Sequence, residues 1–355
     1  MGTGILACAA PALPVKCAPT TPPKPLGQLA AMMLKPGGLF ILGPAMRYEK
    51  PALTLGEQVQ RWCDRGLEVP DAGRAQAYLT AIGYYWLSAY CLPFEQPTPA
   101  GQPRDHGFQS GTRFDDVLAL YVFDRKLRLA VMEAVERIEV AVRTGWAHEL
   151  AIRHGPHAHM NPSLFKSPWE HTRDLARIAN EMEGSAETFV QHYRRTYAEP
   201  FLPPLWAVVE TMSLGTLSRW VKNTRDNEAK MAVARTLGLP TVEVLESVLH
   251  ALTPVRNVCA HHGRLWNRRF ALSLPHIKRH RASLVPPDAA AHQAHYLYNH
   301  LTVLALMMAR LSPGSSWRAR TIALVRSALP PRFVPAMGFP PDWQERPAWR
   351  QEGGS

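Results

Sequence analysis

The chain has 355 residues, of which 46% are hydrophobic and 19% charged, a composition typical of globular proteins that excludes an intrinsically disordered chain. Its formal net charge is +11 at pH 7, so it attracts polyanions such as nucleic acid or an anionic membrane surface, although charge fixes no fold. The most apolar segment, residues 301–311, falls far short of the roughly 18 apolar residues of a membrane-spanning helix. Five scattered cysteines without a CxxC pair exclude a zinc ribbon and a disulfide frame, and they indicate a reducing, cytoplasmic location.

The N-terminal residues differ from the rest of the chain. Residues 1–45 are rich in Pro, Gly, Ala and Thr and show no helical or strand period, so we predict that they are disordered. The opening MGTGILACAAPALPVKC lacks a basic start, and prolines break its apolar part, which argues against a secretory signal peptide. Met46 begins a different kind of sequence and is an alternative start of translation. We therefore expect an extension over 1–45, disordered or mis-assigned, and one domain over 46–350.

From Met46 onward the periodicity is helical, and no run alternates in the manner of a strand. Capping boxes are predicted at Thr54 with Glu57 and at Thr112 with Asp115, the second opening the clearest helix, 114–144. Further helices are predicted over 73–90, 169–183, 186–196, 204–222, 227–237, 241–268, 291–311 and 316–328. The 114–144 helix carries acid–base pairs four residues apart that we expect on its solvent side: Asp124/Arg128, Glu133/Arg137 and Glu139/Arg143. The predicted fold class is all-α, as a single domain.

The segment 256-RNVCAHHGRLWNRR-269 holds the residue types with the most chemical capacity. It closes the 241–268 helix, which Thr241 should cap and Pro254 should kink or restart. Asn257 and His261 lie four residues apart and share a helix face, and the long side chain of Arg256 can reach across to them. A histidine transfers protons near neutral pH, and an arginine stabilises charge on phosphate oxygens, so these residues suit cleavage of RNA by its own 2′-hydroxyl. The alternative, favoured on these residues alone, is that Arg256 pairs with a carboxylate and His261 is a surface histidine.

A basic run follows this segment and contains no acidic residue up to position 281. Lysine and arginine would neutralise phosphates, and interleaved aromatic rings would stack on bases, although a solvated basic face with aromatics in the core gives the same pattern. The candidate RNA-binding residues are Arg264, Trp266, Arg268, Arg269, Lys278, Arg279 and Arg281.

Metal and nucleophile chemistry are less favoured at this segment. Cys259, His261 and His262 do not make the four ligands of a structural zinc site, and adjacent helical histidines point about 100° apart. No serine lies in a G-x-S-x-G context, Cys259 has no acidic orienting residue nearby in sequence, and no glycine-rich phosphate loop is present. We therefore expect neither a metal nor a cofactor.

Several segments in order resemble one known family. Residues 252-LTPVRNVCAHHGRLWNR-268 resemble the Arg-x4–6-His signature of HEPN-type RNases in the form found in Abi-like (AbiD/AbiF-type) bacterial abortive-infection proteins. Residues 82-IGYYWLSAYCLPF-94 resemble that family's Gly-Tyr-Tyr motif, and 120–144 its central helix. Segment 201–220 resembles the part after its Pro-Pro turn, and 337-MGFPPDWQERPAW-349 its closing motif. The resemblance runs from about Met46 to Trp349.

The resemblance implies a HEPN-like helical bundle that dimerises so that two signature helices form one metal-independent RNase cleft. Arg256 then matches the signature arginine, Asn257 the polar residue after it and His261 the signature histidine, with His262 as a substitute. Family members act in phage defence, and some associate with small non-coding RNAs. Tyr84 and Tyr85 are expected to be packing residues. A polar network bracing the central helix is expected from Asp124, Arg125, Glu136 and Arg137.

We therefore predict a cytoplasmic, homodimeric endoribonuclease that acts in abortive infection, with RNA as substrate, no cofactor and no membrane partner. In this interpretation His261 is the general acid and base, and Arg256 holds the phosphate. Asn257 orients these two side chains by hydrogen bonding. One alternative is a protein that holds a structured small RNA without cutting it. Another is a helical regulator whose basic face meets an acidic protein. RNA binding should weaken steeply with salt, which distinguishes it from protein docking.

Overall fold

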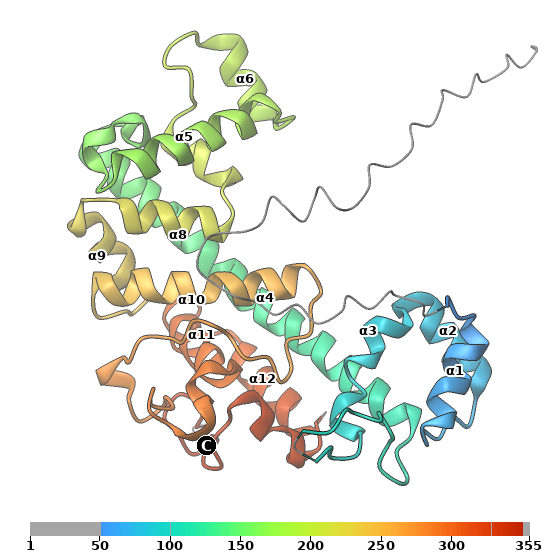
Figure 1. Ribbon diagram of the computed structural model, residues 1–355. Coiled ribbons are helices and arrows are strands. Elements are labelled where there is room, and N and C mark those ends of the chain that lie inside the picture. The colour runs from blue at the N-terminus through green and yellow to red at the C-terminus, as the bar shows by residue number, and fades with distance from the viewer. Residues whose placement is uncertain (1–50, 100, 328, 351–355) are drawn as a thin grey trace, which may run out of the picture. The chain divides into compact units, whose positions relative to one another are not determined.

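The computed structural model describes residues 51–99, 101–327 and 329–350, so the predictions for residues 1–45 lie outside the described residues. Residues from Leu53 onward form one compact unit, whereas the other unit, Met1–Ala52, lies almost wholly outside these ranges. The described part is helical, and its β-structure is limited to isolated bridges such as Glu68 with Arg113 (Figure 1). The prediction of an all-α fold is confirmed. No helix in the described ranges has the length and apolar character needed to cross a membrane.

The α-helices are α1 (Leu55–Asp64), α2 (Ala72–Ile82), α3 (Tyr84–Ser88), α4 (Phe114–His154), α5 (Pro168–Glu183), α6 (Thr188–Thr196), α7 (Leu205–Val208), α8 (Leu214–Asn223), α9 (Asn227–Thr236), α10 (Val242–Ala260), α11 (Leu297–Leu311) and α12 (Trp317–Ser327). Short 3₁₀ turns occur at Leu92–Phe94, Ala158–Met160, Pro162–Leu164, Val209–Thr211, Lys278–His280, Ala290–His295, Pro331–Phe333 and Pro335–Met337.

Helix α4 organises this part of the chain. Its 41 residues, about 60 Å at ~1.5 Å per residue, contact α7, α9, α10, α11 and α12 (Figure 1). Apolar residues recur along it at helical spacing and are buried, among them Leu127, Val131, Val135, Ile138 and Trp146. Helix α10 packs on α4 and most extensively on α8. The candidate site residues near the end of α10 are therefore carried by the most heavily packed helices.

The helix starts follow the sequence, with one shift. Thr54 forms the predicted capping box with Glu57, which accepts from the Thr54 backbone N–H at 2.7 Å. The second box begins one residue later than predicted, because Arg113 is the N-cap and its backbone N–H donates to Asp116. Thr112 instead donates its hydroxyl to Gln109 O and is buried.

Helix ends were harder to predict. The predicted 73–90 helix is divided at Gly83, whose φ of 87° ends α2. Helix α4 continues ten residues beyond Thr144 to His154, and at Gly145 it passes close to Val233 of α9, where an added Cβ would lie 3.3 Å from Val233 Cγ2. Helix α10 runs through Pro254 without restarting, and it ends at Ala260 rather than at residue 268.

The three acid–base pairs of α4 do not share one environment. Glu133 and Arg137 form the expected surface pair at 3.6 Å. The solvent-side prediction is wrong for the other two, because Asp124, Arg128 and Glu139 are buried. These carboxylates contact segments distant in the sequence, which an i,i+4 pattern does not reveal.

The remaining packing predictions are partly confirmed. Arg125, Glu136 and Arg137 are exposed, so only Asp124 of the expected bracing network is buried. Tyr84 stacks on Trp62 with ring centroids 4.9 Å apart, whereas Tyr85 is 91% exposed. Tyr84 is therefore a packing residue, and Tyr85 is available to a partner.

His159 makes the stability of the protein depend on pH. Its ring is fully buried, neither ring nitrogen has a hydrogen-bond partner among the residues that the structure describes, and burial lowers its pKa to about 3. Between that value and the ordinary pKa near 6.5 the unfolded chain binds a proton that the folded chain does not, so stability falls as pH drops through this window. We expect His159 to account for about 2 kcal/mol of lost unfolding free energy between pH 7 and pH 5.

Urea unfolding of wild type and His159→Leu at both pH values measures this contribution. The Leu variant should show a pH difference smaller by about that amount, because it has no titrating group at the position. His250→Gln, at an exposed position of α10, should retain the full wild-type difference. An unchanged difference in His159→Leu would assign the pH dependence to other groups, such as the buried His300.

Candidate functional site

The last turn of α10 closes in a Schellman motif. The backbone N–H of Gly263 donates to Val258 O at 2.8 Å, and that of His262 donates to Cys259 O at 3.1 Å. His261 is the C-cap, and His262 occupies the left-handed position with a φ of 59°. This turn redirects the chain after His261 and explains why residues 261–268 do not continue the helix.

Arg256 lies one turn before this end and faces α4. Its Nε lies 3.5 Å from Glu139 Oε2. The Arg256 Nε is buried, and it has no hydrogen-bond partner in the described residues. Glu139 is already paired with Arg143, which also donates to the backbone oxygen of Met212. Two guanidinium groups, those of Arg143 and Arg256, therefore share the one carboxylate of Glu139.

A surface hollow of about 520 Å³ opens beside this charge cluster. Its lining includes Glu139, Arg143 and Arg256, the exposed apolar side chains Leu129 and Val140 of α4, and two further carboxylates, Glu133 and Glu136. An anion entering the hollow would meet the guanidinium groups of Arg143 and Arg256 on the side away from Glu133, which pairs with Arg137 and Arg320. The alternative interpretation, in which Arg256 pairs with a carboxylate, is thus confirmed. The pair is too long for a hydrogen bond from the Arg256 Nε–H.

Asn257 and His261 are exposed, whereas Arg256 is half-buried. No hydrogen bond or ion pair joins the side chains of these three residues within the described part of the chain, although the His261 backbone N–H donates to Asn257 O at 3.0 Å. A single copy thus presents the predicted residues around one helix end without closing them into one cluster.

The segment after the helix is held by Asp124 of α4, which is fully buried. Its carboxylate accepts from the backbone N–H groups of Leu265 and Trp266, at 3.2 and 2.6 Å, and from the hydroxyl of Tyr90. Arg128 pairs with the same carboxylate. Burial raises the pKa of Asp124 and outweighs the opposing effect of these hydrogen bonds. The sequence did not predict this role, because Asp124 and the backbone N–H groups of Leu265 and Trp266 lie about 140 residues apart in the chain.

Comparison with known proteins identifies a family. The family model described as Abi-like protein matches residues 77–267, which is more than half of the chain and reaches from α2 to just beyond the α10 turn. This chain belongs to the Abi-like protein family. No curated protein and no solved structure matches it.

The basic run of this Abi-like protein divides into buried and exposed parts. Trp266 is 1% exposed, packs on Phe333 and donates its indole N–H to Phe333 O, so the prediction that its ring stacks on bases is wrong. Arg264 donates to Ala89 O at 2.7 Å and ties this segment to the end of α3. The other candidates are exposed: Arg268, Arg269, Lys278, Arg279 and Arg281.

The structure also describes the cysteine in the last turn of α10. Cys259 is buried, and burial raises the pKa of its thiol to about 12, so it stays protonated and inert at neutral pH. Glu139 and Arg143 were not predicted as site residues. Their i,i+4 pairing resembles a surface salt bridge, and only the fold places Arg256 and Met212 beside them.

Proposed function

We propose that this Abi-like protein is a metal-independent endoribonuclease of the HEPN type that acts in phage defence by abortive infection. Family membership supports the defence role. The observation that carries the catalytic part is Arg256, whose buried Nε–H has no hydrogen-bond acceptor and which lines an open hollow one turn before two exposed polar residues, Asn257 and His261.

Each residue has a distinct part in the proposed reaction. The 2′-hydroxyl of the RNA loses its proton and attacks the adjacent phosphorus, while the bond from phosphorus to the 5′-oxygen breaks. His261 transfers protons, as base towards the 2′-oxygen or as acid towards the 5′-oxygen. Arg256 donates to the non-bridging oxygens, where negative charge increases in the transition state. Asn257 orients the histidine or the phosphate by hydrogen bonding. The products are a 2′,3′-cyclic phosphate and a free 5′-hydroxyl.

A second copy of the chain would complete this site. The exposed face of α4 beside Arg256 carries Leu129 and Val140, which are 58% and 51% exposed and lie eleven residues apart, about three turns along one face. Ile152 is 75% exposed but lies about 120° further around the helix, on the separate hollow that Trp206 lines. Two α4 helices crossing antiparallel near Val140 would therefore pack Leu129 and Val140 of one copy against those of the other. Because the first hollow contains both Val140 and Arg256, this pairing brings the two copies' Arg256 sites together.

Charge placed on this face should separate the copies. We expect Leu129→Glu combined with Val140→Glu to weaken self-association about 100-fold or more, because each carboxylate would be buried against an apolar partner. Sedimentation velocity measures the association, and RNA cleavage should fall in parallel. Tyr85→Glu, at an exposed position of α3, is the matched control and should self-associate as wild type does. If Tyr85→Glu dissociated the copies and the double variant did not, the contact between copies would lie near α3 and not on this face of α4.

RNA cleavage by the purified protein in EDTA tests the proposed function. Protein stripped of co-purifying nucleic acid should cut bulk cellular RNA and leave ends that bear 2′,3′-cyclic phosphate. Salt-sensitive RNA binding without any cutting would overturn the catalytic proposal and leave a protein that holds RNA. Cutting that requires a divalent ion would overturn the metal-independent mechanism.

A further inference from the structure

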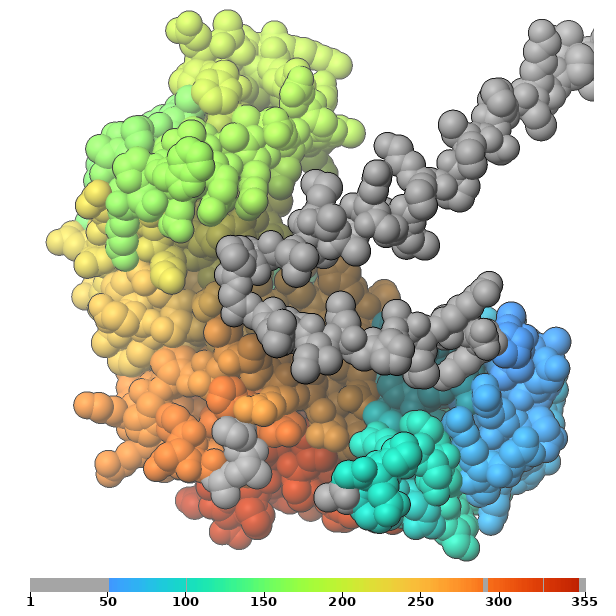
Figure 2. Space-filling view, in the orientation of Figure 1, coloured from blue at the N-terminus to red at the C-terminus, as the bar shows by residue number. Residues whose placement is uncertain are grey.

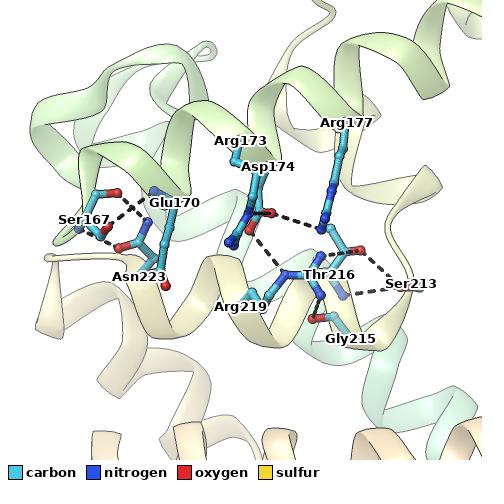
Figure 3. A network of polar contacts seen from close by, with 10 residues as sticks. All are labelled: Ser167, Glu170, Arg173, Asp174, Arg177, Ser213, Gly215, Thr216, Arg219 and Asn223. Carbon is cyan, nitrogen blue, oxygen red and sulfur yellow. Dashed lines mark hydrogen bonds and ion pairs between the residues drawn. The ribbon is translucent and has the colours of Figure 1, made fainter. Parts of the chain in front are cut away.

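Three arginines surround one buried carboxylate where α5 packs on α8 (Figure 3). Asp174 Oδ1 lies 3.2 Å from Arg173 Nε and 3.5 Å from Arg177 Nη1, and Asp174 Oδ2 lies 3.3 Å from Arg219 Nε. Asp174 is 5% exposed, whereas the arginine side chains are 40–57% exposed. We call Arg173, Arg177 and Arg219 the α5–α8 arginine cluster.

This cluster carries more charge than its partner neutralises. One carboxylate balances one of the three guanidinium charges, so the cluster itself retains a net charge of about +2, while the exposed Glu170 and Glu181 lie about one turn to either side of it on α5. Within the described residues, the terminal nitrogens of Arg173 and the Nε and Nη2 of Arg177 have no acceptor. Asp174 thus fixes the guanidinium groups in place and leaves their outward donors for a ligand rich in anionic oxygens.

An aromatic ring lies on the same helix face. Trp169 precedes Arg173 by one turn of α5, as Arg173 precedes Arg177, and its side chain is 76% exposed. The residues of α5 lie at the surface in the space-filling view (Figure 2). An exposed tryptophan in line with arginines that project donors is the arrangement that binds single-stranded nucleic acid, because the ring stacks on a base and the arginines contact adjacent phosphates.

Polar contacts connect this cluster to the candidate active site. Arg219 donates to Thr216, whose hydroxyl lies 3.1 Å from that of Ser213 (Figure 3). Met212, the residue before Ser213, accepts from Arg143, which pairs with Glu139 beside Arg256. The cluster therefore lies on the α8 side of the hollow. The exposed part of the 264–281 run follows α10 in the chain, and in the described residues no hydrogen bond or ion pair joins it to this network.

We propose that the α5–α8 arginine cluster, with Trp169, is a second binding surface for single-stranded RNA. It holds the phosphates and one base of a strand that extends from the Arg256 hollow. This inference rests on the proposed function for the direction of the strand, but the binding itself requires no cleavage.

The test measures affinity for a labelled single-stranded RNA as a function of salt concentration, in a His261→Ala background so that no RNA is cut. Arg173→Gln with Arg177→Gln should weaken binding about tenfold at low salt and reduce the salt slope by about 1.4, as expected for two lost phosphate contacts. Trp169→Ala should weaken binding about tenfold, since stacking contributes about 1–3 kcal/mol per base. Trp169 does not contact Asp174, so this variant tests the surface even if the double variant fails to fold.

Arg235→Gln, at an exposed arginine of α9, is the matched control and should leave affinity and slope close to the background values. Cluster and tryptophan variants that bind RNA as this control does would overturn the inference. If polyglutamate binding falls in those variants while RNA binding stays unchanged, the surface belongs to an acidic protein partner, and the inference is again wrong. Weaker RNA binding by the variants, together with a wild type that never cuts, would support this surface and overturn only the proposed catalysis.

Discussion

Alanine at His261 is expected to slow RNA cleavage by about 10²–10⁴-fold, the range that a positioned general acid or base contributes. RNA affinity should change only a few-fold, because Arg256 and the other arginines supply most of the contacts to phosphate. The substitution should also leave the fold intact, since His261 is exposed and holds the helix end through its backbone N–H. Single-turnover cleavage in EDTA, with affinity measured in parallel, separates the two effects.

Arg256→Ala should lower cleavage by about 10²–10³-fold, because an unreplaced transition-state donor is lost. Glu139 still pairs with Arg143 in this variant. The loss of unfolding free energy should therefore be smaller than when a buried carboxylate loses its only cationic partner. Arg256→Lys should restore little activity, since an ammonium cannot reproduce the planar guanidinium contact.

His262 provides the matched control for His261. It is exposed, and its left-handed φ of 59° makes His262→Gly compatible with the Schellman turn. We expect His262→Gly to cleave at close to the wild-type rate. The reverse result, with cleavage lost in His262→Gly and kept in His261→Ala, would assign the proton-transfer role to His262.

Local physics made some of the fold predictable. Thr54 and Thr241 accept from the backbone N–H groups three residues later, as capping preferences indicate. The all-α class followed from the spacing of apolar residues, which tertiary packing preserves along α4. The end of α10 was not predictable in this way. The left-handed position after a helix is usually a glycine, and here it is His262.

The candidate site shows a second kind of limit. Asp124 with Arg128 and Glu139 with Arg143 have the same spacing as Glu133 with Arg137, yet two of these pairs are buried and one is exposed. Their environments depend on which distant segments pack against each turn of α4. Trp266 likewise looked available for stacking until Phe333 was placed against it. Sequence identifies the chemical types at the site, whereas burial and partners come from long-range packing.

Asp124 should have the largest effect on stability of any residue near the site. Asp124→Ala removes the partner of a buried arginine and the acceptor for Tyr90 and two backbone N–H groups at once. Removing one partner of a buried ion pair costs about 3–5 kcal/mol, so we expect a loss of unfolding free energy in that range. Urea unfolding measures it, with Asp115→Ala as control. Asp115 forms a half-exposed pair with Arg74, and its loss should cost about 1 kcal/mol or less.

Loss of the Asp124 contacts should also loosen the segment after α10 before the whole protein unfolds. Leu265 and Trp266 follow the α10 turn and are held to α4 through Asp124, so their amide protons should exchange faster in Asp124→Asn even where the protein stays folded. Cleavage should then fall while RNA affinity persists, because the turn that presents His261 is no longer fixed. Pairing Asp124→Leu with Arg128→Met should recover much of the stability, since an apolar pair leaves no buried charge unmatched. A double variant as unstable as Asp124→Ala would instead show that the backbone N–H groups, not Arg128, are the partners whose loss dominates.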